Sequence, residues 1–319
     1  MPQTRAATHA LALLASLAAV QAPALAQDAA PADNTRDDAP PAEVVKPAPA
    51  GPTVSLRLSG SLHAGADTDT GDGDLSLARA GALLEAAFPL GERRSLAVGL
   101  GIERSWYDFD NAASLDPGGD PFGDVTDTEL TLRYTAPLNA DTSWFLLGAI
   151  GLAAEDGADL SDSVVYTGGG GFITKASESF SWGLGVVVRS RLEDDPLVVP
   201  IPQIRWSIDE RWTLESRRAG LRLGYAHSDT LTYGVQGEYL SRSFRLDEDG
   251  PIPDGMATDR RVPVSVFAEY QPSKAVSIGA AIGASVYSNI ELLDADGDDL
   301  ADDDLDPALF VSINARIAF

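Results

Sequence analysis

The sequence predicts an all-β fold, an antiparallel up-and-down transmembrane β-barrel of twelve to fourteen strands, on two observations. Between residues 53 and 319, segments of roughly 8–17 residues alternate apolar with polar or small side chains, as strands with two different faces do. Each segment also reaches the length of about 9–11 residues that a tilted strand needs to cross a bilayer. A soluble β-sandwich is the alternative, but its strands average only about 5–6 residues.

The composition excludes several other classes of protein. The chain has 319 residues, a formal net charge of −25 and no cysteine. Such an acidic chain repels phosphate backbones, so we expect no nucleic-acid partner. The absence of cysteine excludes disulfides and zinc-thiolate sites. Beyond the N-terminal segment, no apolar run reaches the roughly 18 residues of a transmembrane helix.

The first 52 residues read as an export signal followed by a tether. Arg5 precedes an apolar stretch over 10–20, and Ala24-Leu-Ala26 is a small-x-small cleavage site, so residues 1–26 are expected to be a signal peptide. A retained membrane anchor is the alternative, but about eleven apolar residues are too few to span a bilayer. Residues 27–52 are rich in Ala and Pro, which predicts a disordered periplasmic tether ahead of the barrel at 53–319.

The connections between the predicted strands alternate between short and long, as in outer-membrane barrels with short periplasmic turns and long extracellular loops. The short turns are 89–94, 139–142, 175–179, 209–211, 228–230 and 271–274. The long loops are rich in Asp, carry no Lys or Arg, and lie at 67–74, 110–123, 156–162, 193–197, 248–258 and 291–307.

Aromatic residues gather beside the short turns. Because Trp and Tyr prefer the level of the lipid headgroups, this placement predicts an aromatic girdle at the periplasmic end. A soluble protein would scatter its aromatic residues through the centres of its strands. The predicted girdle consists of Phe88, Tyr134, Trp144, Trp182, Trp206, Trp212, Tyr225, Tyr233 and Tyr270.

The C-terminal segment carries the most specific motif. From Leu309 onward, alternate residues are apolar and the chain ends on Phe319. This pattern resembles the terminal strand of bacterial outer-membrane β-barrel proteins. The resemblance implies an outer-membrane location, contact with lipid and lipopolysaccharide, and an assembly signal, read by the barrel assembly machinery, formed by Phe319, Ile317 and Ile313. The segments 201–212 and 220–225 also look like parts of uncharacterised porin-like barrel families.

The strand count depends on residues 212–227. As one continuous strand they would give thirteen strands, whereas single-chain bacterial barrels have even numbers. We therefore divide the segment at 217–220 into a short hairpin. Twelve long strands and this hairpin then make a barrel of twelve strands, with the hairpin folded at the wall, or of fourteen.

The face opposite the apolar one carries charges that would be costly in lipid, so these side chains are predicted to line the lumen. One interpretation is an Arg–Glu network that braces the wall. The other is a polar pore for porin-like passage of small solutes. A plugged structural or surface-interaction barrel is the alternative function. The predicted lumen residues are Arg57, Glu103, Glu129, Arg133, Arg189, Arg191, Arg205, Arg222, Glu238, Glu269 and Arg316.

The loop at 294–306 resembles a calcium-binding Asp-repeat loop. Its candidate ligands are Asp294, Asp296, Asp298 and Asp302, with the carbonyl of Leu300. The loop departs from the pattern because position 6 is Asp rather than Gly and position 12 is Leu rather than Glu. The alternative is a solvated acidic loop, so Ca²⁺ is the one cofactor the sequence suggests.

No catalytic constellation is evident, so we expect no enzyme. The mature chain has only His63 and His227 as histidine bases, and the predicted topology places them at opposite ends of the barrel. The glycines at 168–171 lie inside a predicted strand with no following Lys, so they indicate a bend or close packing rather than a phosphate loop.

Overall fold

A computed structural model describes residues 51–70, 73–112, 115, 120–192 and 196–319. The predicted signal peptide at 1–26 and nearly all of the predicted tether at 27–52 lie outside these residues. Among the described residues, no helix is both long and apolar enough to cross a membrane.

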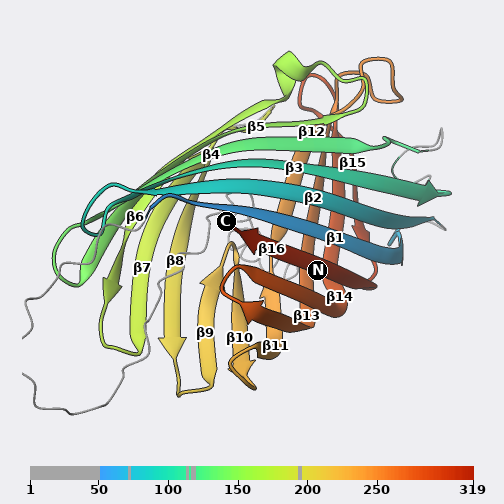
Figure 1. Cartoon of the computed structure of the whole chain (residues 1–319). Coiled ribbons are helices and arrows are strands. Elements are labelled where there is room, and N and C mark those ends of the chain that lie inside the picture. Colours follow the sequence, from blue (N-terminus) through green and yellow to red (C-terminus); the bar gives the residue numbers. More distant parts are fainter. Residues whose placement is uncertain (1–50, 71–72, 113–114, 116–119, 193–195) are drawn as a thin grey trace, which may run out of the picture.

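Strands make up most of the described chain, as predicted (Figure 1). They are β1 Thr53–Asp67, β2 Asp74–Pro89, β3 Ser95–Asp110, β4 Val125–Pro137, β5 Thr142–Glu155, β6 Val164–Lys175, β7 Phe180–Arg189, β8 Leu197–Ser207, β9 Trp212–Arg217, β10 Gly220–Ala226, β11 Leu231–Glu238, β12 Leu240–Arg245, β13 Met256–Ser273, β14 Val276–Leu293, β15 Asp299–Leu305 and β16 Ala308–Ala318. A single 3₁₀ turn, η1, spans Leu160–Ser163.

The strands form a closed antiparallel barrel with fourteen positions around its wall. From β1 to β11 each strand pairs with the next in sequence, β11 pairs with β13, β13 with β14 and β14 with β16, and β1 pairs with β16 to close the ring. Two positions hold two strands each, because β11 and β12 pair with successive parts of β13, and β16 and β15 with successive parts of β14. The prediction of twelve to fourteen strands is therefore confirmed at its upper value.

The predicted short hairpin is also confirmed. β9 and β10 pair from Trp212–Tyr225 up to Arg217–Gly220, and only two residues connect them. Arg218, the first of these two, has a φ of 49°, the left-handed conformation that a tight hairpin turn requires.

One predicted loop is wrong. Residues 291–307 were expected to form an open acidic loop, but β14 continues through Leu293 and β15 begins at Asp299, so only 294–298 turn. The physical reason is an alternation within the acidic run. Asp303 and Leu305 point inward and are 2% and 5% exposed, whereas Asp302 and Asp304 face solvent. The predicted loop at 248–258 is likewise shorter, because β13 begins at Met256.

The short turns are held by their own side chains. At the β8–β9 turn, the Asp209 carboxylate accepts hydrogen bonds from the N–H groups of Arg211 and Trp212, both at 2.7 Å. These bonds lower the pKa of Asp209. Asn139 does the same for Asp141 and Thr142 at the β4–β5 turn. Asp and Asn form such turns readily, which explains why these connections are short.

The outer surface is apolar around the barrel, with an aromatic girdle at the turn end. Most of the predicted girdle residues are exposed, and neighbouring rings pack edge to face or at a tilt across the strands. The pairs are Tyr134–Trp144, Phe172–Trp182, Phe180–Trp206, Trp212–Tyr225 and Tyr225–Tyr233. We infer that this end faces the periplasm, because short turns mark the periplasmic end of such barrels.

Glycines permit a close approach between β5, β6 and β7, where the sheet turns sharply (Figure 1). A Cβ on Gly171 would lie 2.5 Å from the Cα of Gly185 and 2.9 Å from the Phe145 ring. The inward-facing Phe145, which is 3% exposed, occupies the space these glycines leave. The predicted bend at 168–171 thus arises from the absence of side chains.

The loop end of the barrel is filled by a hydrophobic cluster. Inward-facing residues of β2 and β3 meet residues of the connections 111–124 and 246–255 and of the long β12–β15 extensions. Its members include Leu75, Leu77, Tyr107, Phe109, Phe122, Phe244, Leu246, Ile252, Ile290 and Leu292. We call this group the loop-end cluster.

Candidate functional site in the barrel lumen

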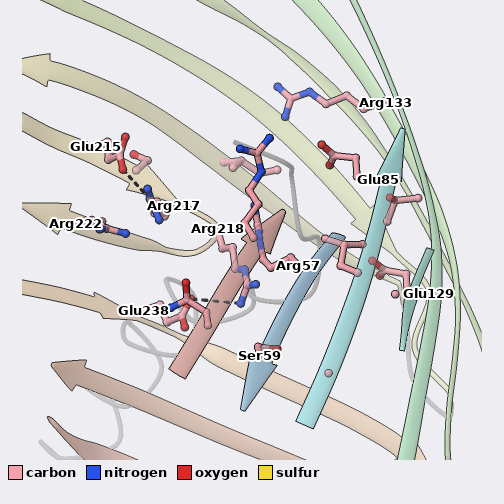
Figure 2. Close-up of a pocket in the computed structure, with 18 of the residues that line it drawn as sticks. Arg57, Ser59, Glu85, Glu129, Arg133, Glu215, Arg217, Arg218, Arg222 and Glu238 are labelled. Carbon is pink, nitrogen blue, oxygen red and sulfur yellow. Dashed lines mark hydrogen bonds and ion pairs between the residues drawn. The ribbon is translucent and has the colours of Figure 1, made fainter. Parts of the chain in front are cut away.

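Below the loop-end cluster lies a polar cavity of about 1170 Å³ inside the barrel. Residues from each of the fourteen wall positions contribute to its lining, because alternate side chains on a strand face inward. Figure 2 shows side chains from several strands converging on this space, with Arg57 near its centre.

The structure places ten of the eleven predicted lumen residues along this cavity. They are Arg57, Glu103, Glu129, Arg133, Arg189, Arg205, Arg222, Glu238, Glu269 and Arg316. Arg191 is not among the lining residues, because β7 ends at Arg189 and the alternation no longer directs side chains beyond that point.

The cavity lining is rich in positive charge. Thirteen basic side chains line it against eight acidic ones, whereas the whole chain has a formal net charge of −25. Low-dielectric walls strengthen the field of such an excess within the lumen. The lining therefore carries an excess of positive charge, opposite in sign to the net charge of the whole chain.

Some of these charges are paired, as the bracing interpretation requires. Arg222 on β10 donates a 2.7 Å hydrogen bond to Glu269 on β13, and its guanidinium lies 3.6 Å from the centre of the Phe267 ring. Arg242 on β12 donates a 2.9 Å bond to Glu103 on β3, which joins strands far apart in the sequence.

Other arginines make no ion pair with the described part of the chain. Arg57 on β1 lies directly opposite Arg316 on β16 in the ladder that closes the barrel. Like charges directly opposite one another are destabilising in a sheet unless something neutralises them. Arg189 and Arg205 likewise have no carboxylate within ion-pair distance among the described residues. These side chains provide places where a mobile anion would be stabilised.

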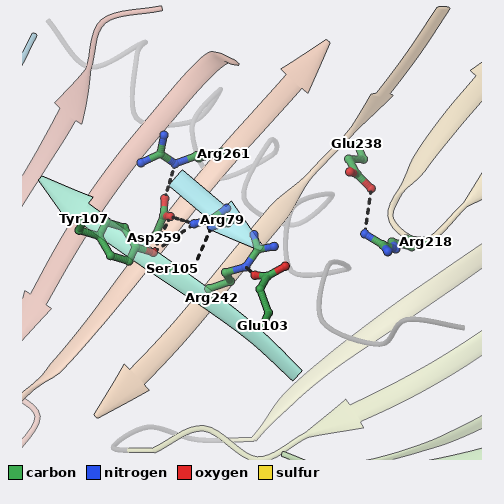
Figure 3. A network of polar contacts seen from close by, with 9 residues as sticks. All are labelled: Arg79, Glu103, Ser105, Tyr107, Arg218, Glu238, Arg242, Asp259 and Arg261. Carbon is green, nitrogen blue, oxygen red and sulfur yellow. Dashed lines mark hydrogen bonds and ion pairs between the residues drawn. The ribbon is translucent and has the colours of Figure 1, made fainter. Parts of the chain in front are cut away.

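A buried ionic network separates the cavity from the loop-end cluster, and Figure 3 shows its members. The Asp259 carboxylate forms ion pairs with Arg79 and with Arg261, the latter at 2.7 Å. Tyr107 donates a 2.9 Å hydrogen bond to the same carboxylate, and Arg79 donates to Ser105 at 3.1 Å. All of these side chains are buried.

This network is not predictable from the sequence pattern. Arg79 and Asp259 are 180 residues apart, so no local pattern links them. One signal was present, because the adjacent pair Arg260-Arg261 on a strand must place one arginine inward. Arg260 is the outward one and pairs with Glu291.

The two histidines lie at opposite ends of the barrel. His63 is near the loop end of β1, buried and stacked on Phe310 at 5.2 Å between ring centres. His227 begins the β10–β11 turn, where its N–H donates to the carbonyl of Leu231. This separation matches the predicted topology.

The predicted calcium ligands are not gathered around one point. Asp294 accepts hydrogen bonds from the N–H groups of Asp296 and Asp298, both at 2.9 Å, and so holds the β14–β15 turn. Asp302 lies on β15, where it accepts from the Asn289 amide at 2.6 Å. Within the described residues, no group of three or more His, Asp or Glu side chains is placed to hold a metal ion. Calcium binding stays a prediction.

Residues 79–319 match the family model described as "Domain of unknown function (DUF6268)". No curated protein matches the chain.

Several solved structures share the barrel architecture. The COG4313 outer membrane channel from Pseudomonas putida F1 is 15% identical with a TM-score of 0.46, over 85% of this chain and 97% of that chain. The P. putida toluene transporter TodX is 8% identical with a TM-score of 0.43, over 85% and 90%. The KdgM porin is 11% identical with a TM-score of 0.36, over 83% and 99%.

We predict that Asp259→Ala lowers the free energy of unfolding by about 3–5 kcal/mol, because it leaves two buried guanidinium groups uncompensated. The measurement is urea unfolding of the reconstituted barrel. Asp124→Ala is the matched control, since Asp124 pairs with Arg104 at 2.9 Å on the exposed rim and should cost at most about 1 kcal/mol. Equal losses in both variants would contradict the buried network.

The β14–β15 turn gives a test that separates charge from hydrogen bonding. Asp294→Asn keeps the side-chain oxygen that accepts from the two N–H groups, so it should retain wild-type stability. Asp294→Ala removes that oxygen and should cost about 0.5–2 kcal/mol, as the loss of a comparable capping side chain does. Thermal unfolding in detergent measures both variants.

The same variants test the predicted calcium site. A bound ion would stabilise the wild type in calcium but not in sodium at matched ionic strength, and Asp294→Asn would abolish that shift. Equal shifts in calcium, magnesium and sodium would instead indicate screening of a solvated acidic rim.

Proposed function

The chain belongs to the DUF6268 family, and we propose that it is an outer-membrane channel for the passage of small solutes, with a preference for anions. The observation that carries the proposal is the cavity of about 1170 Å³ with its excess of basic side chains. Binding cavities for small molecules have volumes of about 300–1000 Å³, so this lumen can accommodate a small solute.

The distribution of ion pairs supports passage over a purely structural lumen. A lumen that served only to brace the wall would pair its charges, as Arg222 and Arg242 do. The side-by-side Arg57 and Arg316 contribute repulsion instead, which a passing anion would relieve. Several weak, adjacent cationic positions also suit conduction, because a solute must be able to leave each one.

We propose no catalytic role for this lumen. Of the two histidines, only His63 lines this cavity, where its ring stacks on Phe310, and His227 lies at the β10–β11 turn. Acid–base catalysis would need a nucleophile and an orienting group beside such a base.

The exterior supports a lipid partner and an assembly partner. We propose that the apolar band contacts outer-membrane lipid and that the acidic loops lie at the level of lipopolysaccharide. We propose further that the barrel assembly machinery reads the terminal strand. Ile313, Ile317 and Phe319 are all exposed on its outer face, while the N–H of Phe319 donates to the carbonyl of Val54.

Ion selectivity tests the proposed function. In planar bilayers with a potassium chloride gradient, the purified protein should conduct and its reversal potential should show anion preference. Arg57→Glu should move the reversal potential toward cation preference, because it reverses a charge within the lumen. Arg104→Glu is the matched control, since it makes the same change of charge outside the lumen, where Arg104 pairs with Asp124 and Asp156.

Two results would contradict the proposal. The first is an absence of conductance in well-folded protein, which would favour a plugged structural barrel. The second is an equal shift of the reversal potential in both variants, which would attribute selectivity to overall charge rather than to the lumen.

The assembly proposal predicts that Phe319→Ala lowers the amount of heat-modifiable barrel in outer-membrane fractions several-fold. Phe88→Ala is the control, because Phe88 is an exposed girdle residue away from the terminus. If both variants assemble equally well, or fail equally, Phe319 has no special role as a signal.

A further inference from the structure

The barrel wall is incomplete beside β8. This strand pairs with β7 along ten residues, from Trp206 up to Leu197. On its other edge it pairs with β9 over only three residues, from Ser207 to Arg205. The short β9–β10 hairpin accounts for the difference, because it ends at 218–219 while β8 continues toward the loop end (Figure 1).

The strand across this gap is also unpaired on the facing edge. β12 pairs with β13 along six residues on one side. On the other side its ladder is a single bridge, between Arg245 and Ala154 of β5. Above the hairpin, neither this edge of β12 nor the facing edge of β8 therefore has a continuous strand partner in the described part of the chain.

The sequence of β8 is adapted to this open edge. The N–H of Ile204 points toward the gap and donates to the Ser216 hydroxyl at 3.1 Å. Because N–H groups alternate in direction along a strand, residues 202 and 200 would point the same way, and both are proline. An unsatisfied N–H in lipid costs several kcal/mol. Because proline has no backbone N–H, residues 202 and 200 leave no such group unsatisfied at this edge.

The same prolines argue against a protein partner at this edge. A strand added from another chain would need N–H donors from β8, which Pro200 and Pro202 cannot supply. The opening is therefore better suited to a small molecule than to strand addition.

The gap lies at membrane depth. The six residues of β9, each rising about 2.5 Å along the membrane normal when tilted, lift the hairpin tip roughly 15 Å above the periplasmic turn. The apolar band of such a barrel is about 25 Å tall, so the gap opens onto the outer half of the bilayer. Apolar side chains face lipid here, with Val198 of β8 62% exposed and Leu221 of β10 52% exposed.

The lumen side of the gap is cationic. Arg217 and Arg218 stand at the hairpin tip, and both line the cavity together with Gln203 of β8 and Leu240 of β12. Figure 2 shows the Arg218 side chain beside that of Arg57. Arg217 is paired with Glu215 at 2.6 Å, whereas the Glu238 carboxylate lies 3.9 Å from Arg218, so the Arg218 pair is the weak one.

We propose that this gap is a lateral window through which amphipathic anions, with an apolar body and one anionic head, pass between the outer leaflet and the lumen. The proposal rests on the proposed function and deepens it. An apolar body suits the lipid-facing edges, and an anionic head suits the arginines behind them. A purely ionic solute would gain nothing from the apolar edges, and a hydrocarbon would gain nothing from the guanidinium groups.

The experiment compares two sulfonates that share a head group. Radiolabelled methanesulfonate and octanesulfonate, both permanently charged, are offered at micromolar concentration to proteoliposomes. Ser241→Cys, on the β12 edge of the window, is labelled in detergent with a 5 kDa polyethylene glycol maleimide before reconstitution. Val266→Cys is labelled identically as the control, because Val266 faces outward on β13, which has partners on both sides.

We expect the label at Ser241 to reduce octanesulfonate flux at least tenfold, and the label at Val266 to leave it unchanged. Unlabelled Ser241→Cys should carry octanesulfonate at the wild-type rate, which controls for folding. Equal octanesulfonate flux through the two labelled proteins would overturn the window. Passage of methanesulfonate but not octanesulfonate by the wild type would also overturn it while leaving the proposed function intact. If the wild type transports neither sulfonate, the proposed function itself is contradicted.

Discussion

Backbone hydrogen bonding in lipid is the constraint on which the rest of this structure depends. No water is present in the hydrocarbon layer, so each strand must find its partners in neighbouring strands, and the sheet must close. The nine-residue pairing of β1 with β16 closes it. Closure fixes which side chains face inward along every strand. Along the edge of β8 above Ile204, where this pairing lapses, the chain has Pro200 and Pro202 in place of donors that would be unsatisfied.

Much of the architecture was predictable because the period-two pattern and the turn chemistry are local properties. The alternation in Leu309–Phe319 and the short hairpin at 217–220 needed only neighbouring residues to interpret. The cost of placing charge in lipid predicted which alternate side chains face the lumen, and Arg57 and Arg316 do line it.

The loop end was not predictable on the same grounds. Period-two alternation identifies an apolar face but does not say whether lipid or a protein core covers it. On β2, Leu75 and Leu77 face inward into the loop-end cluster, while Leu84 faces lipid. The acidic strand β15 was predicted as a loop for a related reason. The inward positions of Leu305 and the buried Asp303 depend on packing against residues distant in sequence. The Arg79–Asp259 pair depends entirely on tertiary structure.

The placement of charge and apolar packing together favours entry from the side. An anion approaching along the barrel axis from outside meets exposed carboxylates such as Asp298 and Asp302, which repel it. Beyond them lie the loop-end cluster and then the buried Asp259 network. At the window, by contrast, an amphipathic anion encounters an apolar edge first and guanidinium groups next. A lateral route above the β9–β10 hairpin bypasses these carboxylates, because there the edge of β8 has no strand partner within the described residues.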